Sequence, residues 1–280
     1  MADAQVKLAE GKTKVIWDAG DGKVTIESKD DITAGDGAKH DMLEGKAITA
    51  NQTTSNVFAL LKAKGLATHF IERTADRAFK ARSAKMIPLE LVARRIATGS
   101  YLKRRPDVKE GTIFGDLVVE FFEKDDPNHD PLVIFDFVTG RLLRYTASKP
   151  LGEGFMNEQP LAETIFKDLD APQILTLVEL TKQAFEVLEA AWAEQEVTLV
   201  DLKIEAGRDA ETDELFIADV VDNDSWRIWP GGDKSQMKDK QVYRNLAGVD
   251  DPAAKAKELG KIKQNYTWVA EATEKFSQGE

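Results

Sequence analysis

Short runs of β-branched and aromatic residues, separated by turn residues, dominate the first half of the chain and predict strands. The expected strands are Lys14 to Asp18, Val24 to Ser28, Thr68 to Arg73, Met86 to Arg94 and Leu117 to Phe122. The tripeptide Gly20-Asp21-Gly22 supplies a tight turn between the first two. The first half of the chain is therefore expected to be rich in sheet.

Three longer segments carry the spacing or the end signals of helices. Glu44 to Lys64 stops at Gly65, the favoured residue after a helix end. A second helix follows Pro172, and its apolar residues recur every three or four positions as one buried stripe. The stripe contains Ile174, Leu177, Val178, Thr181, Phe185, Leu188 and Trp192. A closing helix is expected from Pro252, a good first-turn residue, to Phe276. The stripe belongs to the core and receives no chemical role.

Two late strands are expected after the long helix. Thr198 to Ala206 and Leu215 to Val221 are joined by a turn from Gly207 to Asp213. The segment from Asp130 to Pro160 has no clear period and contains prolines and glycines around Pro150. We therefore interpret that segment as loop.

Composition narrows the classes of function. The chain of 280 residues carries 38 Lys and Arg against 49 Asp and Glu, a formal charge of −11. This acidity argues against a general nucleic-acid binder, because affinity for the phosphate backbone comes from Lys and Arg. An anionic ligand must instead meet a local cluster of positive charge. The absence of cysteine excludes disulfides, thiolate metal ligands and cysteine nucleophiles.

No segment predicts a membrane span or a secretory leader. The longest unbroken apolar run, Val57 to Leu61, has five residues, whereas a bilayer-spanning helix needs about 20. The segment Met1 to Gln5 lacks the basic and apolar regions of a leader. We therefore expect a cytoplasmic protein without a membrane partner.

The strongest local signal for chemistry is the strand Leu199 to Ala206. Because side chains alternate along a strand, Asp201, Lys203 and Glu205 share one face while the apolar residues share the other. A half-buried strand with a solvated polar face is the plainer interpretation. The next strand, however, places one carboxylate, Asp219, among apolar neighbours, and a buried carboxylate needs a cation or strong donors.

If these two strands pair as a hairpin, Glu205 and Asp219 converge on one point. Two carboxylates are what Mg²⁺ takes when it also holds substrate phosphates. The layout is similar to the catalytic region of protein kinases. The chain has neither a His-Arg-Asp nor an Asp-Phe-Gly motif, which argues against a protein kinase proper.

Gly11-Lys12-Thr13-Lys14 is similar to the end of a phosphate-binding loop. The Walker pattern needs a glycine five residues earlier, where the chain has Val6, so we assign no Walker motif. A glycine turn between two strands could still lay backbone N–H groups and lysines over phosphates, as kinase-type folds do. Alone, this signal is weak.

The densest basic stretch runs from Arg94 to Arg105. Within it, Gly99 permits a tight turn, and Ser100 can donate its hydroxyl and backbone N–H to an oxyanion. Arg94 leaves an apolar strand and is expected to anchor a carboxylate or phosphate. The residues Lys103 to Arg105 are expected to form a solvated basic loop. The loops around Asp36 and His129-Asp130 could be ordinary turns, and Arg227 lies shortly after Asp219.

Together these motifs resemble the SAICAR synthetase family, the phosphoribosylaminoimidazole-succinocarboxamide synthases of purine biosynthesis. Ile87 to Ser100 matches one family signature throughout. Leu199 to Gly207 matches the other except at Ala206, on the packing face, where the family usually has phenylalanine. The resemblance covers most of residues 8 to 270, and the unmatched residues 132 to 165 are interpreted as a lineage-specific insertion. Asp222 to Arg227 and Asp239-Lys240-Gln241 are most similar to the synthetase half of the animal bifunctional enzyme, and no carboxylase half is expected.

The resemblance implies an α+β fold with two interlocked lobes of the ATP-grasp or kinase-like type, with mainly antiparallel sheets and flanking helices. Residues 1–92 would form a β-rich nucleotide-binding lobe, and residues 93–280 an α+β lobe with the metal and substrate site. The implied activity is an ATP-dependent ligase that joins CAIR, a carboxylated aminoimidazole ribonucleotide, to L-aspartate. Its products would be SAICAR, ADP and phosphate. A carboxylate is a poor acyl donor, so an acyl phosphate is the expected intermediate.

The resemblance also implies roles for individual residues. Asp201 and Lys203 would be catalytic and, with Asp36, would orient the imidazole and its carboxylate. ATP would contact Gly11, Lys12, Thr13, Lys14, Lys85, Met86, Glu205 and Asp219, and the last two would hold Mg²⁺. The ribonucleotide phosphate would bind Arg94, Ser100 and Arg227, and L-aspartate would bind Lys124 and Asp130. Formation of a homo-oligomer stays open.

Two alternatives come from other classes of function. A small-molecule kinase on the same scaffold would stop at phosphoryl transfer. A non-catalytic nucleotide-binding module would bind ATP without forming a product. The joint presence of Asp201, Lys203, Glu205 and Asp219 disfavours the module.

Overall fold

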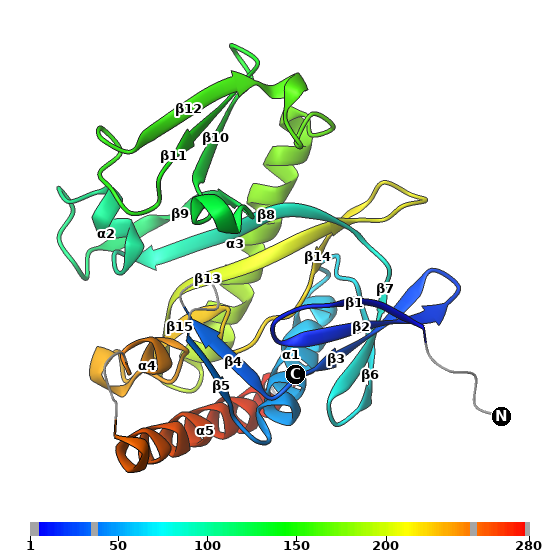
Figure 1. Ribbon diagram of the computed structural model, residues 1–280, viewed down its shortest axis with the longest axis vertical. Helices are drawn as coiled ribbons and strands as arrows, with labels where there is room; N and C mark the ends of the chain where they lie inside the picture. Colours follow the sequence, from blue (N-terminus) through cyan, green and yellow to red (C-terminus); the bar gives the residue numbers. More distant parts are fainter. Residues whose placement is uncertain (1–5, 35–38, 247–250, 278–280) are drawn as a thin grey trace.

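A computed structural model describes residues 6–34, 39–246 and 251–277, and they form two antiparallel sheets flanked by helices (Figure 1). The smaller sheet has five strands in the order β1-β2-β3-β7-β6. Their bounds are β1 (Lys7–Glu10), β2 (Lys14–Gly20), β3 (Lys23–Ser28), β7 (Ala78–Arg82) and β6 (Phe70–Ala75). A separate hairpin, β4 (Asp31–Ala34) and β5 (Lys39–Met42), lies beside it.

The larger sheet has eight strands, seven of them in the order β12-β11-β10-β9-β8-β13-β14, while β15 also pairs with β13. Their bounds are β8 (Lys85–Ile96), β9 (Ile113–Glu123), β10 (Leu132–Asp136), β11 (Arg141–Tyr145), β12 (Phe155–Pro160), β13 (Val197–Arg208), β14 (Leu215–Ala218) and β15 (Trp226–Pro230). Strands β10 to β12 form the outer end of this sheet (Figure 1).

Strand β13 has β8 along one edge and two partners along the other. Its C-terminal part pairs with β14 and its N-terminal part with β15. Between these two partners the chain from Asp219 to Ser225 leaves the sheet, and the Ser225 carbonyl accepts the Lys203 backbone N–H at 2.6 Å. This detour opens space beside the middle of β13, where the charged residues lie.

Long helices cover the apolar faces. They are α1 (Lys46–Ala63), α3 (Ala171–Ala193) and α5 (Pro252–Glu274). Two shorter helices are α2 (Ser100–Arg104), between β8 and β9, and α4 (Gln241–Arg244), which precedes α5. The N-terminus of α3 is fixed by a capping box between Asp170 and Gln173. Gly65 follows α1 with a left-handed φ of 83°, as a residue after a helix end should.

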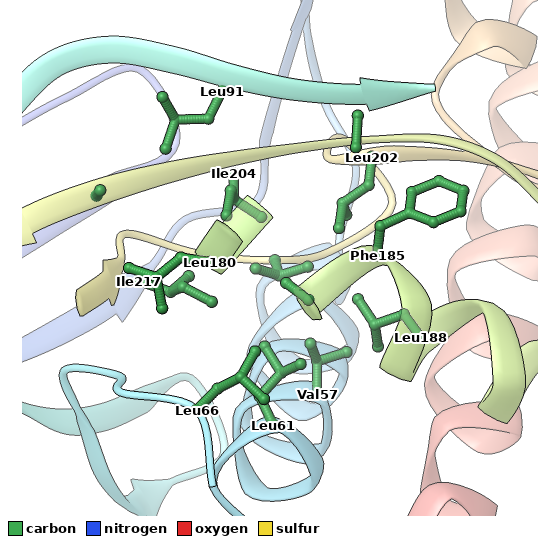
Figure 2. Close-up of a cluster of buried hydrophobic side chains, with 14 of the residues drawn as sticks. Val57, Leu61, Leu66, Leu91, Leu180, Phe185, Leu188, Leu202, Ile204 and Ile217 are labelled. Carbon is green, nitrogen blue, oxygen red and sulfur yellow. The ribbon is translucent and has the colours of Figure 1, made fainter. Parts of the chain in front are cut away.

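The main core lies between α3, α1 and the two sheets. Figure 2 shows Phe185 of α3 near Leu202 of β13, and Leu180 of α3 near Ile204 of β13, in the same core. The predicted stripe of the long helix is buried, apart from a partly buried Val178. Ala206 is 1% exposed in the same core. None of the helices in the described residues is long and apolar enough to cross a membrane.

The predicted strands and helices before residue 130 and after residue 170 are confirmed, with shifted ends. Thr68 is one exception, because it makes only an isolated bridge to Ile217 before β6 begins at Phe70, and the strand expected to reach Val221 ends at Ala218, before Asp219. The interpretation of Asp130 to Pro160 as loop was wrong, since β10, β11 and β12 lie within it. The prolines and glycines around Pro150 mark the turn between β11 and β12 only.

Candidate active site

The polar face of β13 is built by alternation along the strand. Asp201, Lys203 and Glu205 line two adjoining cavities, while Leu202 and Ile204 pack in the core. The predicted division of this strand into a charged and an apolar face is thereby confirmed. Asp201 and Glu205 are each 5% exposed, so their charges need partners within the protein.

Glu205 is held by two lysines. Lys124 Nζ donates to both carboxylate oxygens at 2.8 and 2.7 Å, and Lys203 Nζ lies 3.7 Å from Oε1. Burial raises the pKa of Glu205, but the charges of Lys203 and Lys124 outweigh it, so the pKa is lowered overall. Glu205 therefore stays an ionised carboxylate at neutral pH.

Lys203 lies between two carboxylates that stand directly opposite each other on adjacent strands. Glu90 of β8 is the direct partner of Glu205 in the β8–β13 register, and Lys203 Nζ donates to Glu90 Oε1 at 2.8 Å. Burial lowers the pKa of Lys203, but Glu90 and Glu205 outweigh it and the pKa is raised. Like charges directly opposite each other would repel without this ammonium group.

Asp219 stands at the point where β14 ends. Its φ of 64° is in the left-handed region, and its backbone carbonyl accepts a hydrogen bond from His69 Nε2 at 3.0 Å. Burial lowers the pKa of His69 to about 3, so the imidazole is neutral. The Asp219 carboxylate forms an ion pair with Lys14 Nζ. The prediction that Asp219 faces a cation is confirmed.

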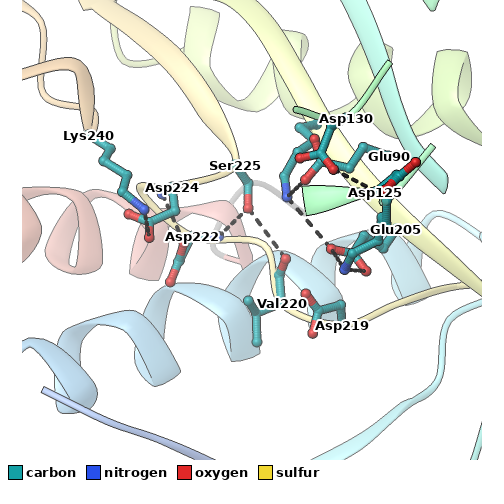
Figure 3. A network of polar contacts seen from close by, with 12 residues as sticks. Glu90, Asp125, Asp130, Glu205, Asp219, Val220, Asp222, Asp224, Ser225 and Lys240 are labelled. Atoms are coloured by element: carbon teal, nitrogen blue, oxygen red, sulfur yellow. Dashed lines mark hydrogen bonds and ion pairs between the residues drawn. The ribbon is translucent and has the colours of Figure 1, made fainter. Parts of the chain in front are cut away.

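The β13–β14 hairpin brings the two predicted metal ligands together. Glu205 pairs directly with Ala218, the residue before Asp219. Figure 3 shows the Glu205 and Asp219 side chains near each other, beside the detour that carries Asp222 and Asp224. Both carboxylates line a cavity of about 570 Å³, together with Gly11, Lys12, Thr13 and Lys14.

Asp201 lies between two arginines on neighbouring strands. Arg94 of β8 and Arg227 of β15 are its direct partners in the two registers. Arg94 Nη1 donates to Asp201 Oδ2 at 2.8 Å, and Arg227 Nη1 donates to the same oxygen. Arg94 Nε also donates to Glu120 at 2.7 Å. Both arginines and Ser100 line a cavity of about 240 Å³ that adjoins the larger one.

Gly99 and Arg104 complete this arginine cluster. A Cβ atom on Gly99 would lie 2.8 Å from Arg227 Nη2, so only glycine lets the guanidinium reach this position. Arg104 is 1% exposed and donates to Glu120 at 2.6 Å. The interpretation of Lys103 to Arg105 as a solvated loop was therefore wrong for Arg104, because the side chain folds back onto the carboxylate that Arg94 also binds.

A third cavity, of about 480 Å³, is largely apolar. Leu8, Ile16, Val24, Ile26, Met86, Ile87 and Pro88 line it, and it reaches Lys14, Glu205 and Asp219 at its polar end. Lys85, which sequence reasoning placed at the nucleotide, is not among the residues that line it. A flat apolar ring could enter this cavity with a charged group directed at the carboxylates and lysines.

The structure places the remaining predicted residues as follows. Lys12 forms an exposed ion pair with Asp126, and Lys124 is occupied by Glu205. Asp130 lines both polar cavities. Asp36 lies outside the described residues.

Several residues of the site were missed by sequence reasoning. Glu90 shares a strand face with Arg94, since the two are four residues apart on β8, and that alternation could have found it. Asp224 binds Lys240 at 2.7 Å and Tyr266 at 2.5 Å. No local pattern signals that contact, because Asp224 and Tyr266 come together only in the folded chain.

Asp239 closes the segment behind Arg227. Its carboxylate is 3% exposed and accepts the backbone N–H groups of Ile228 at 3.2 Å and Gln241 at 2.8 Å. Burial outweighs these hydrogen bonds and raises the pKa of Asp239 from 3.8 to about 6.

Asp239→Asn is expected to remove one step from the pH dependence of stability. The folded-state pKa lies above the unfolded value, so the native protein binds this proton more tightly. The stability that the group contributes is complete below pH 3.8 and is lost as the pH rises to about 6, by roughly 3 kcal/mol. Urea denaturation across this range should show the loss in the original protein and not in the variant. A difference between the two that is constant with pH would contradict the assignment.

The fold and the site together define a class of protein. Strands of the two antiparallel sheets line an apolar cavity that ends in lysines and paired carboxylates, which is the arrangement of the kinase-like, ATP-grasp-related fold. The chain belongs to the SAICAR synthetase family, whose model matches residues 7–259. The resemblance seen in the motifs is thereby confirmed.

Curated relatives of the family align with nearly the whole of this chain. It is 44% identical to the Homo sapiens bifunctional phosphoribosylaminoimidazole carboxylase/phosphoribosylaminoimidazole succinocarboxamide synthetase, over 98% of this chain and 60% of that protein. It is 42% identical to phosphoribosylaminoimidazole-succinocarboxamide synthase of Chloroflexus aurantiacus, over 97% of each. The chain thus spans less than two thirds of the length of its animal relative.

Solved structures show the same fold. The synthase of Ehrlichia chaffeensis superposes with a TM-score of 0.76 at 26% identity, covering 96% of this chain and 98% of that one. A SAICAR synthetase in complex with ADP gives a TM-score of 0.75 at 26% identity, covering 95% and 96%.

Proposed function

We propose that the protein is an ATP-dependent ligase that joins CAIR to L-aspartate and forms SAICAR, ADP and phosphate. The observation that supports this proposal most directly is that three neighbouring cavities share lining residues. The apolar cavity meets the carboxylate and lysine cluster, which adjoins the cavity of Arg94, Asp201 and Arg227. A nucleotide and a second anionic substrate can therefore meet at Lys203.

Adenine would occupy the apolar cavity against Met86 and Pro88, and the phosphates would extend over Gly11 to Lys14. The solved relative in complex with ADP supports a nucleotide in this family. The ribonucleotide phosphate would lie at Ser100 and the arginine cluster. The carboxylate of CAIR would then point toward Lys203. The raised pKa of Lys203 keeps its amine charged, so it can pair with an oxyanion.

The carboxylates of Glu205 and Asp219 fit a magnesium ion. They are oxygen ligands on adjacent segments, and the described residues contain no cluster of three acidic or histidine ligands that would bind a metal alone. Mg²⁺ commonly takes one or two carboxylates and completes its shell with substrate phosphates and water. When bound there, it would neutralise the charge that develops on the transferred phosphoryl group. Lys14 and Lys124 would release these carboxylates and turn to the phosphates.

Acyl transfer follows from the same geometry. The substrate carboxylate, held near Lys203, would accept the terminal phosphoryl group of ATP and become an acyl phosphate. The amine of L-aspartate would then attack the acyl carbon and release phosphate. A kinase would stop after the first step, and the family membership does not favour it.

An omission assay tests the proposal. ADP and SAICAR should form only when ATP, CAIR and L-aspartate are all present with Mg²⁺, and mass spectrometry should find the amide product. ATP turnover that does not need L-aspartate would support the kinase instead.

Two broader features belong to the same proposal. The lobes 1–92 and 93–280 would be interlocked, since β8 runs from Lys85 to Ile96 through the boundary. The protein would work in the cytoplasm on small molecules, without nucleic acid or membrane, and self-association stays a prediction. Size-exclusion chromatography with light scattering would measure its oligomeric state.

A further inference from the structure

Almost every cation that lines the two polar cavities is matched by a carboxylate of the protein. The pairs are Lys12 with Asp126, Lys14 with Asp219, Lys124 with Glu205, Lys203 with Glu90, Lys240 with Asp224, and both Arg94 and Arg227 with Asp201. Arg244 differs from all of them. Among the residues that the structure describes, no carboxylate lies within 4.0 Å of its guanidinium, and Nη1 makes a long 3.4 Å hydrogen bond to Gln241.

Arg244 lies where the two cavities meet. It lines both of them, together with Glu90, Asp130, Lys203, Asp224 and Ser225. Ser100 and Arg94 line only the smaller cavity of these two, and Lys14 and Asp219 only the larger. The junction is therefore the place where a third reactant can approach groups bound on either side.

The residue before Arg244 ties helix α4 to the β4–β5 hairpin, while the Arg244 side chain is exposed. The preceding residue, Tyr243, is fully buried, and its hydroxyl donates to Asp41 at 2.9 Å. Lys39 Nζ donates to the Tyr243 carbonyl at 2.8 Å. Helix α4 thus presents a charged guanidinium to the junction and is anchored through Tyr243.

We propose that Arg244 binds a carboxylate of the amino-acid substrate, and this inference rests on the proposed function. L-Aspartate brings two carboxylates to a site whose other cations are already neutralised. A guanidinium can hold a carboxylate through two parallel hydrogen bonds. For the ribonucleotide phosphate, the smaller cavity already offers Ser100 and Arg94, neither of which lines the larger cavity as Arg244 does. Arg244 is therefore a specificity-determining residue for the amine donor.

Steady-state kinetics of Arg244→Gln and Arg244→Lys test this assignment, with each of the three substrates varied in turn. Loss of a charge-assisted pair should raise the KM for L-aspartate by about 10- to 100-fold in Arg244→Gln. The KM of Arg244→Lys for L-aspartate should fall between those of the original protein and Arg244→Gln, because lysine keeps the charge but lacks the two parallel N–H donors of the guanidinium. The KM values for ATP and CAIR should stay close to the original ones. Arg73→Gln, an exposed arginine of β6, is the control for a lost surface charge.

A second measurement separates recognition from general damage. The preference for L-aspartate over L-asparagine or L-alanine should shrink in Arg244→Gln if the guanidinium binds the side-chain carboxylate, and a raised KM for all three would assign it to the α-carboxylate. Both results support the proposal. A raised KM for CAIR with an unchanged KM for L-aspartate would overturn it, as would unchanged kinetics. An original protein that forms no SAICAR would instead refute the proposed function.

Discussion

Asp219→Asn is expected to lower kcat by about 10²- to 10³-fold or more while leaving the fold intact. The carboxylate pairs with Lys14 and lines the same cavity as Glu205, so under the proposed function its charge would serve the phosphate end of the site. The amide of asparagine keeps the shape but not the charge. Asparagine also tolerates the left-handed φ of 64°, so the backbone held by His69 should not move.

The matched control is Asp213→Asn. Asp213 also has a left-handed φ, of 60°, but its side chain is 64% exposed in the turn before β14 and pairs with Arg208. Its replacement should leave both kcat and the melting temperature unchanged. The measurements are ADP release under saturating substrates and thermal unfolding. Near-normal turnover in Asp219→Asn would remove the basis for a metal ion at this position.

Arg94→Met should cost about 3–5 kcal/mol of unfolding free energy and most of the activity. Arg94 is 4% exposed and binds both Asp201 and Glu120. Removal of Arg94 leaves the carboxylates of Asp201 and Glu120 with fewer cationic partners. Asp201 then keeps only its ion pair with Arg227. The positions of Asp201 and Arg227 beside the smaller cavity should then change together.

Arg95→Met provides the comparison within the same strand. Arg95 points to the other face of β8 and pairs with Glu189 of α3 at 2.7 Å, with its side chain 20% exposed. A partly exposed pair of this kind contributes about 1 kcal/mol or less. Urea denaturation should give a lower midpoint for Arg94→Met than for Arg95→Met at equal slopes. Equal losses of stability would show that the arginine cluster is not the buried network described above.

Sequence patterns predicted the elements whose residues face one continuous core. The α3 stripe and the alternation of β13 come from a single periodicity that burial then enforces. The hairpin of β13 and β14 followed from its turn, and it brought Glu205 and Asp219 together. The site was therefore predictable where neighbouring segments of the chain built it.

The missed features depend on contacts between distant segments. Strand β12 (Phe155–Pro160) is short and mostly polar, so it carries no clear pattern, whereas the apolar run Leu132 to Phe135 of β10 was a strand signal that sequence reasoning overlooked. Arg104 is buried because Glu120 of β9 receives it, and that contact has no local signal. Arg244 stands out only after every neighbouring cation has been matched with its carboxylate.

The register of β13 links correct folding to activity. A slip of this strand by one residue against β8 would turn Asp201, Lys203 and Glu205 inward and expose their apolar neighbours. Under the proposed function, such a molecule would lose its nucleotide, metal and ribonucleotide contacts together, so misfolded copies would have no activity rather than a reduced activity. In a refolded preparation, the specific activity would then measure the fraction of molecules with the correct β13 register. The Michaelis constants of these molecules would equal those of the native protein.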